Sequence, residues 1–312
     1  MAYWEDFDKP FSFKRDFTYD TQVADRIILT RKTLGGTLFV DRLFKILGIE
    51  SPSKVYPPRT NANLRALYSQ IIASSSPNTH KQSLIYYILR DCRGTSDGSK
   101  HLQFARRSYL PEQYRLLIDG LWHLDRLEFR RALEFIMDPS LIPLFPDEIL
   151  YVLATSPKRD DNLAIAYYVT VNPPLASSKY LNAYFGVVCR KGIVEAFNFT
   201  RKQQKSTSLQ LLEQLITFVL STNLGETRAN RALALVNLPF NDVEEGHFED
   251  VLLRGSAKNL LGAKDTVMMR RIATSRLENL DAELEALSGR KIEGFNWDDL
   301  RRNLRANNSL AS

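Results

Sequence analysis

The chain has 312 residues, of which 44% are hydrophobic and 25% are charged. This composition excludes a largely disordered chain and supplies enough apolar material for a substantial core. The net charge of +6 is mild for this length, which favours a solvated basic surface over a dedicated nucleic-acid site, because phosphate-binding proteins usually concentrate Lys and Arg in a patch or stripe.

The N-terminal segment, residues 1–19, mixes aromatic with charged residues and lacks helical periodicity. It has no apolar region of the kind that a signal peptide requires. No run in the chain reaches the roughly 18 uncharged apolar residues that a membrane span needs. We therefore expect an extended N-terminal segment, no transmembrane segment, and residence in the cytosol or the nucleus.

Helical periodicity dominates the chain from there onward. Apolar residues recur at spacings of three and four, which places them on one face of a helix. Three of these stripes are Leu64, Leu67, Tyr68, Ile71 and Ile72; Tyr114, Leu117, Ile118, Leu121 and Trp122; and Leu211, Leu212, Leu215, Ile216 and Val219. Few segments alternate in the way that a β-strand requires, so strands have little support.

Capping residues and breaks predict where these helices begin and end. Thr37 is a suitable cap for a helix that ends before Gly48. Asp242 and Glu245 have the spacing of a capping box at the start of another helix. Short breaks that contain proline separate the helical runs and favour antiparallel neighbours packed as αα-hairpins. We predict an all-α fold, an irregular helical array or α-solenoid, in one domain over residues 20–287.

A search for catalytic and metal-binding patterns finds none. No two of the four histidines lie at a metal-ligand spacing. Cys92 and Cys189 form no CxxC pair, so we interpret them as small thiols buried in a reducing compartment. The segment Gly255–Thr266 looks like a phosphate-binding loop, but too many residues separate its glycines, and we interpret it as a loop that leads into a helix. We expect no enzymatic activity, no cofactor, no metal and no small-molecule substrate.

Charged residues are spread along the helical runs, where a solvated surface is their ordinary role. The basic clusters are Arg126, Arg130 and Arg131; Lys264, Arg270, Arg271 and Arg276; and Arg301, Arg302 and Arg305. We interpret the first two clusters as solvated helix faces. The third lies beside Trp297, and it either contacts nucleic acid or flanks a peptide motif that docks on an acidic partner.

The C-terminal segment, residues 288–312, is polar but contains four isolated large apolar residues, Phe295, Trp297, Leu300 and Leu304. The last three have the spacing of one short helical face. A stretch this short cannot form a core by itself. It therefore either folds back onto its own helical array or docks into a groove on a partner, and in the second case these four residues are the partner-binding site.

A series of stretches follows in a fixed order from about residue 20 to residue 276. They are DRLFKILGI (Asp41–Ile49), VYPPRTNANLRALYSQI (Val55–Ile71), KQSLIYYILRD (Lys81–Asp91), LIDGLWHLDRLEFRRALEFIMDPSLIPLFPDEIL (Leu117–Leu150), LAIAYYVTVNPPLAS (Leu163–Ser177), IVEAFNF (Ile193–Phe199), VNLPFNDVEEGHFEDVLL (Val236–Leu253) and AKDTVMMRRIA (Ala263–Ala273). Each alone is ordinary helix-core sequence. In this order and combination, the chain resembles the helical domain of ELYS-like nuclear pore complex assembly proteins.

The resemblance implies an all-α structural protein, without catalysis, that resides at the nuclear envelope and supports pore assembly. It implies binding to the Y-shaped outer-ring subcomplex of the pore, near its propeller-bearing short arm. Larger animal relatives add a propeller and a chromatin-binding tail with AT-hooks. This sequence has neither a stretch long enough for a propeller nor an AT-hook, so it is similar to the short fungal form, and the resemblance does not extend to direct chromatin or DNA binding.

Two other functional classes stay open at this point: a helical adaptor of another nuclear complex, and a nucleic-acid-binding module. The residues that carry the resemblance also have a purely structural interpretation. We expect core packing from Trp122, Phe129, Leu133 and Ile136. Asp125 and Arg126 fit either a pair at a helix boundary or two exposed residues.

Overall fold

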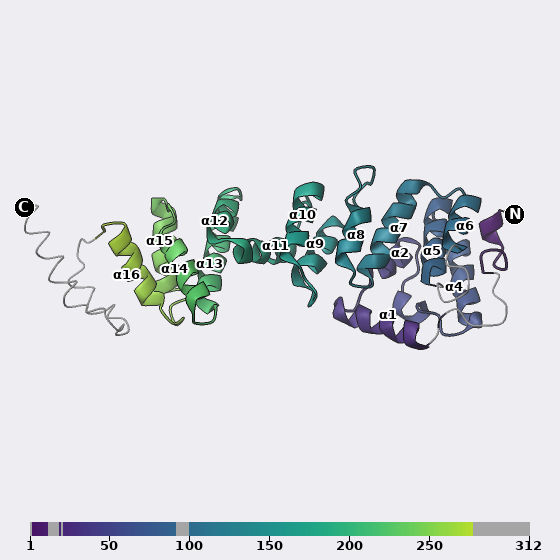
Figure 1. The fold of residues 1–312 in the computed structure, drawn as a ribbon, viewed down its shortest axis with the longest axis horizontal. Helices are drawn as coiled ribbons and strands as arrows, with labels where there is room; N and C mark the ends of the chain where they lie inside the picture. The colour runs from purple at the N-terminus through teal and green to yellow at the C-terminus, as the bar shows by residue number, and fades with distance from the viewer. Residues whose placement is uncertain (1, 12–18, 20, 92–99, 277–312) are drawn as a thin grey trace, which may run out of the picture. The chain divides into compact units, whose positions relative to one another are not determined.

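The computed structural model describes residues 2–11, 19, 21–91 and 100–276 (Figure 1). Within these ranges the chain forms sixteen α-helices and one short 3-10 helix, and no strand. The predicted all-α helical array is therefore confirmed. Among the described helices, none combines the length and the hydrophobicity that crossing a bilayer requires.

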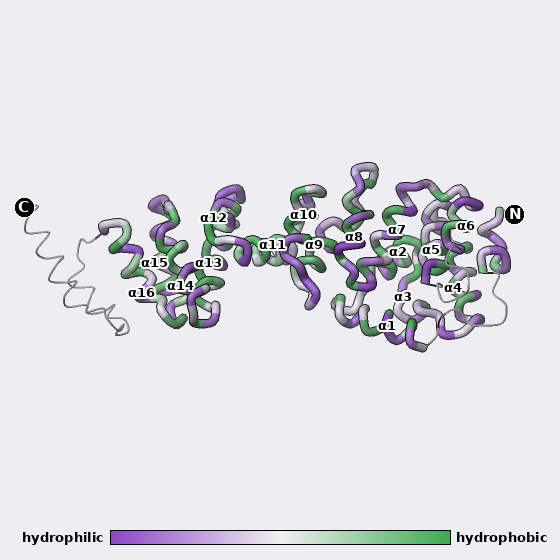
Figure 2. Tube along the Cα trace, viewed as in Figure 1, coloured by the Kyte–Doolittle hydropathy of each residue, from purple (hydrophilic) through white to green (hydrophobic). Residues whose placement is uncertain are grey.

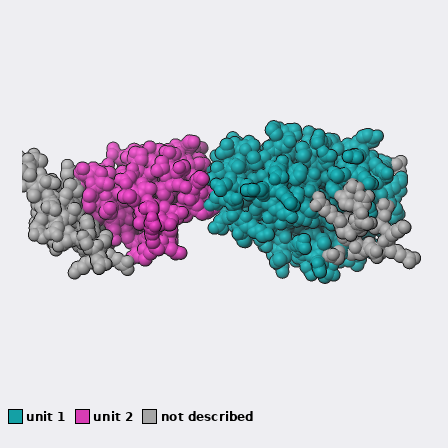
Figure 3. All heavy atoms as spheres, in the orientation of Figure 1, with its two compact units in different colours: residues 1–184 teal, residues 185–312 magenta. Residues whose placement is uncertain are grey.

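The chain divides into two compact units, residues 1–184 and 185–312 (Figure 3). The division falls within helix α11 (Ser178–Lys191). The domain predicted over residues 20–287 includes helices of both units, and its unfolding as one cooperative domain stays a prediction. The C-terminal segment, residues 288–312, lies outside the described residues.

Unit 1 is built around helix α5. Its helices are α1 (Thr21–Thr33), α2 (Phe39–Ile46), α3 (Pro52–Val55), α4 (Asn61–Ala73), α5 (Asn78–Asp91), α6 (Lys100–Arg107), α7 (Glu112–Leu124), α8 (Phe129–Ile136), α9 (Pro146–Thr155) and α10 (Asp161–Val171). α5 packs against α2, α4, α6 and α7, and every residue from Gln82 to Asp91 is buried. A helix covered on all sides shows no apolar stripe, because it has no solvated face.

The N-terminal segment also packs onto unit 1. Residues Tyr3–Glu5 form the 3-10 helix η1. Trp4 and Phe11 are buried, and the Tyr68 hydroxyl on α4 donates to the Trp4 carbonyl at 2.7 Å. Of the predicted segment 1–19, the structure describes residues 2–11 and 19, and these contribute to the core of unit 1.

Unit 2 is built around helix α13. Its helices after α11 are α12 (Ile193–Arg201), α13 (Lys205–Ser221), α14 (Glu226–Val236), α15 (Asp242–Leu253) and α16 (Ala263–Ala273). α13 packs against α12, α14 and α15, and α16 packs against α14 and α15. Neighbours along the chain are thus neighbours in space, as expected of stacked helical hairpins.

The predicted apolar stripes are the buried faces of α4, α7 and α13. All five stripe residues on α13 are buried. On α4 and α7 the inner residues are buried, whereas Ile72, Tyr114 and Leu117 are half-buried at the edge of the stripe. The four residues expected to form core around α7 and α8 are buried as well. Many helices change along their course between hydrophobic and hydrophilic residues, as helices with one buried face do (Figure 2).

Two predicted helix caps are wrong by one residue each. α2 begins at Phe39, and Leu38 occupies the cap position in place of Thr37. α15 begins at Asp242, but its capping box joins Asn241 to Glu244, with both hydrogen bonds at 2.9 Å. The first amides of α2 donate to Asp125, from a distant part of the chain, whereas the box of α15 is local and lies one residue before the predicted pair. The predicted stop at Gly48 is confirmed, since this glycine has a φ of +82°, which a side chain would strain.

Candidate functional site

The residue types that carry chemistry do not gather in a catalytic or metal-binding arrangement within the described ranges. No group of three or more His, Cys, Asp or Glu side chains there has a geometry suited to a metal ion. Cys189 is buried, as predicted, and burial raises the pKa of its thiol to about 12, so it carries little thiolate at neutral pH. Cys92 lies outside the described residues.

Asp91, at the end of α5, is the centre of a buried polar network in unit 1. Its Oδ2 accepts hydrogen bonds from the hydroxyls of Tyr19 at 2.7 Å and Tyr56 at 2.6 Å. Its Oδ1 accepts from Trp122 Nε1 at 2.9 Å and Arg126 Nη2 at 2.7 Å. With four donors on two oxygens, the carboxylate is saturated. It therefore joins α5 and α7 to Tyr19 and to the residue that follows α3, and it has no lone pair left for a substrate.

Arg126 was expected on a solvated basic face, and this interpretation is wrong. Its guanidinium lies 3.4 Å from the centre of the Trp122 ring, a cation–π contact, and pairs with Asp91. Burial lowers the pKa of Arg126, but the combined effects of Asp91, Tyr87 and Tyr56 outweigh burial and raise this pKa above its ordinary value. The charge is therefore held inside the unit by its partners and contributes nothing to a surface for phosphate.

Asp125 caps helix α2 from a distant part of the chain. Its carboxylate accepts hydrogen bonds from the amides of Phe39 at 2.7 Å and Val40 at 2.9 Å, and from the Tyr87 hydroxyl at 2.8 Å. These amides are the first of α2, which have no partner within the helix. Asp125 also follows the last residue of α7. The helix-boundary alternative is thus confirmed, and exposure of Asp125 is excluded because the residue is buried.

The pKa of Asp125 predicts a dependence of stability on pH. Burial raises this pKa from 3.8 to about 7, although the three hydrogen bonds oppose the shift. The folded chain therefore holds the Asp125 proton more tightly than the unfolded chain does. We expect this residue's contribution to the unfolding free energy to be fully present below about pH 4 and to be lost as the pH rises towards about 7.

Asp125→Asn isolates this contribution, because asparagine does not titrate. Denaturation of both proteins from about pH 4 to about pH 8 gives the difference in unfolding free energy, in which the effects of all other groups cancel. The advantage of wild type over the variant should fall as the pH rises. A difference that is constant, or that grows with pH, would contradict the raised pKa.

His123 occupies a similar buried position. Its Nδ1 lies 2.7 Å from Glu128 Oε2 and its Nε2 lies 3.0 Å from Arg90 Nη2. Arg90 is always a donor, so Nε2 accepts from it, and Nδ1–H donates to the carboxylate. Burial lowers the pKa of His123 against the opposing effect of Glu128, which favours this neutral tautomer. The ring is fully engaged in holding α5, α7 and the following turn together.

Unit 2 also contains a buried ion pair, between Arg270 on α16 and Glu245 on α15. Arg270 Nη2 lies 2.7 Å from Glu245 Oε2, and Arg270 Nη1 donates to the carbonyls of Val236 and Leu238 at 2.6 Å each. The side chains are 6% and 3% exposed, so the expected solvated face is wrong for Arg270. Glu245 is engaged in this pair, and the capping box of α15 uses Glu244.

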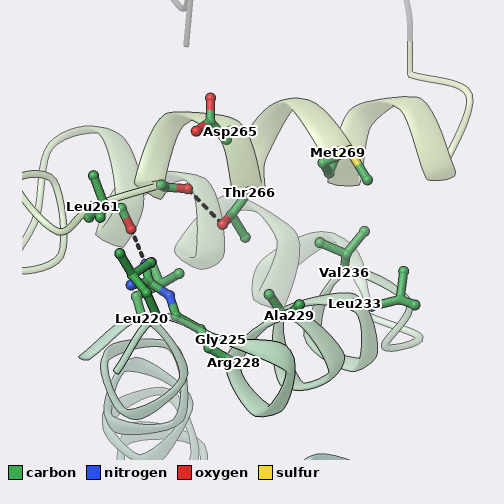
Figure 4. Close-up of a pocket in the computed structure, with 13 residues that line it drawn as sticks. Leu220, Gly225, Arg228, Ala229, Leu233, Val236, Leu261, Asp265, Thr266 and Met269 are labelled. Atoms are coloured by element: carbon green, nitrogen blue, oxygen red, sulfur yellow. Dashed lines mark hydrogen bonds between the residues drawn. The ribbon is translucent and has the colours of Figure 1, made fainter. Parts of the chain in front are cut away.

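An apolar groove lies in unit 2, lined by the end of α13, by α14 and by α16 (Figure 4). Its volume is about 530 Å³, within the usual range for binding pockets, which is about 300–1,000 Å³. Four large apolar residues on its walls are well exposed: Leu224 is 68% exposed, Leu233 is 56%, Leu261 is 43% and Met269 is 45%. Their convergence on one groove is what distinguishes them from isolated surface hydrophobics.

Hydrogen bonds from Arg228 connect the segments that form one end of the groove. The side chain of Arg228 donates to the carbonyl of Leu261 (Figure 4) and also to that of Thr222 at 3.5 Å, which ties the loop before α16 to the start of α14. Gly262, which has a φ of +81°, is the N-cap of α16. The predicted loop leading into a helix over Gly255–Thr266 is thereby confirmed, and this loop forms one end of the groove.

The site residues predicted from the sequence, Phe295, Trp297, Leu300 and Leu304, lie outside the described residues. The groove in unit 2 is not visible in the sequence. Its walls come from three separate segments, and each exposed residue alone looks like part of an ordinary amphipathic helix. A weak signal was present in α14, where Leu233 falls outside the stripe formed by the buried Leu235 and Val236.

Sequence similarity to known proteins covers most of the chain and includes helices of both units. The family profile described as ELYS, nuclear pore complex assembly, matches residues 37–255. The uncharacterized protein ely5 of Schizosaccharomyces pombe is 31% identical over 237 residues, which cover 75% of this chain and 75% of that protein. Protein ELYS of Xenopus laevis is 23% identical over 210 residues, covering 65% of this chain but only 8% of the frog protein. The chain therefore belongs to the ELYS family of nuclear pore complex assembly proteins.

Proposed function

We propose that this chain is a non-enzymatic structural component of the nuclear pore complex at the nuclear envelope. It binds the Y-shaped outer-ring subcomplex at its propeller-bearing short arm and supports pore assembly. The observation that carries the proposal is the family match over residues 37–255, which spans helices of both units. The saturated polar networks also support a structural role. Their side chains are engaged in packing, so binding would have to use the surface of the protein.

The direct test is to purify the endogenously tagged protein at high salt and to identify its partners by mass spectrometry. High salt removes non-specific electrostatic contacts, which matter for a chain with a net charge of +6. We expect stoichiometric recovery of outer-ring subunits. Recovery of another nuclear complex without outer-ring subunits would instead assign the chain to an adaptor role, and affinity for DNA that is lost at high salt would favour nucleic-acid binding.

Within this function, we assign the partner anchors to Phe295, Trp297, Leu300 and Leu304. Trp297→Ala is expected to weaken binding to the reconstituted short arm about thirtyfold, because one buried aromatic anchor often contributes roughly 2 kcal/mol or more. Calorimetric titration measures this affinity. The matched control is Asp299→Asn. This substitution lies on the opposite face of the same expected helix and should leave the affinity nearly unchanged. Equal affinity of Trp297→Ala and wild type would exclude this site.

A further inference from the structure

Leaving the apolar groove of unit 2 exposed to water costs free energy, which an occupant that covers it would recover. Each exposed square ångström of apolar surface costs about 25 cal/mol relative to burial. Leu233 on α14 and Met269 on α16 both line the groove, and the small side chains of Ala229 and Ala232 leave room between the large ones. An occupant with a few bulky apolar side chains on one face would fill such a space.

We propose that this groove holds the chain's own C-terminal segment, residues 295–304, in the free protein. This inference rests on the proposed function, because the same side chains are the proposed partner anchors. The partner then competes with the groove for them, and the free chain keeps its anchors covered until the partner is met.

The pattern of the segment fits a groove between helices. Trp297, Leu300 and Leu304 stand at positions i, i+3 and i+7, the spacing with which an amphipathic helix lays its apolar face into a groove. The groove offers the complementary arrangement. Its lining residues on α14 and on α16 recur at spacings of three and four, so each helix turns one continuous stripe towards the occupant.

The position of the segment along the chain also favours this occupant. The described residues end at Arg276, directly after α16, which forms one wall of the groove. Residues 277–296 then connect this point to Trp297. A random coil of twenty residues would have an end-to-end distance of about 25 Å, whereas α16 itself is only about 16 Å long. The segment can therefore reach any part of the groove, at an effective concentration on the order of millimolar.

One hydrogen-bond acceptor of the groove, on Asp265, matches donors that the segment carries. Asp265 lines the groove, and its Oδ1 is shielded from solvent without a hydrogen-bond partner among the described residues. A buried acceptor of this kind is costly unless a donor reaches it. The indole N–H of Trp297 and the guanidinium of Arg301, one helical turn further, are donors that this occupant would bring.

Hydrogen exchange of the full-length protein, with no partner present, tests the inference. The backbone amides of residues 295–304 should be protected at least about tenfold relative to an unstructured chain. Leu233→Asp places a charge on an exposed wall of the groove and should abolish this protection. Val194→Asp is the matched control, since Val194 on α12 is 51% exposed, lies in the same unit and does not line the groove. It should leave the protection intact.

Three results would overturn the inference: no protection in wild type, unchanged protection in Leu233→Asp, or protection that rises with protein concentration, which would indicate a second copy as the occupant. Exchange of α13 and α15 amides reports whether Leu233→Asp keeps its fold. Met269→Asp, on the other wall, repeats the test if it does not. Because no outer-ring subunit is used, the result is independent of the purification that tests the proposed function.

Discussion

Asp91→Ala is expected to lower the unfolding free energy of unit 1 by about 3–5 kcal/mol, the usual effect of removing one partner of a buried ion pair. The variant leaves the Arg126 charge inside the unit without its carboxylate. It also leaves the hydroxyls of Tyr19 and Tyr56 and the indole N–H of Trp122 without their acceptor. Each loss adds a desolvation penalty, because these donors cannot all regain water.

Denaturant unfolding measures this loss, with tryptophan fluorescence as the signal, since Trp122 belongs to the network. Asp8→Ala is the control. Asp8 pairs with Arg65 at 2.5 Å, but both side chains are more than half exposed, so its removal should change the stability little. If the two variants were equally stable, the network centred on Asp91 would not be a main source of the stability of unit 1.

Arg270→Ala should produce a loss of similar size in unit 2, about 3–5 kcal/mol. Glu245 would stay buried without its cation, and the carbonyls of Val236 and Leu238 would lose their donor. The contact between the guanidinium and the Phe240 ring, 4.6 Å from its centre, would be lost as well. Together these interactions hold α16 against α15 and the end of α14, so their loss should also open the groove.

The double variant Arg270→Met with Glu245→Leu separates the two causes of this loss. Replacing both charges by apolar side chains removes the uncompensated charge, and such replacements of buried pairs are often neutral or stabilising. We expect the double variant to regain most of the stability that Arg270→Ala loses. Circular dichroism during thermal unfolding measures the stability of both variants. A double variant as unstable as Arg270→Ala would show that the hydrogen bonds to the two carbonyls matter more than the charge.

The helical faces and helix ends of this fold were predictable because each depends on a short stretch of sequence. A spacing of three and four residues predicts a helical face wherever the helix lies, and the stripes of α4 and α13 are buried accordingly. Gly48 ends its helix because of its own backbone freedom. The order of helix-core stretches likewise identified the family, since each stretch could be compared residue by residue without knowing what it packs against.

The contacts between distant parts of the chain were not predictable in the same way. The cap of α2 comes from Asp125, 86 residues after Phe39, and the local candidate, Thr37, was therefore a wrong choice. Arg126 and Arg270 were predicted to be solvated because the residues next to them in sequence do not indicate that each pairs with a carboxylate on another helix.

The sequence by itself thus determined the all-α class, the main helical faces and the ELYS family, because these follow from local periodicity and from the order of short stretches. Only the tertiary structure decided which charges are buried, which polar groups cap distant helices, and where an apolar groove lies open. The physical reason is that burial, dielectric environment and exposed area are properties of packed neighbours. Leu233, Leu261 and Met269 become one surface only when α14, α16 and the loop between α15 and α16 come together.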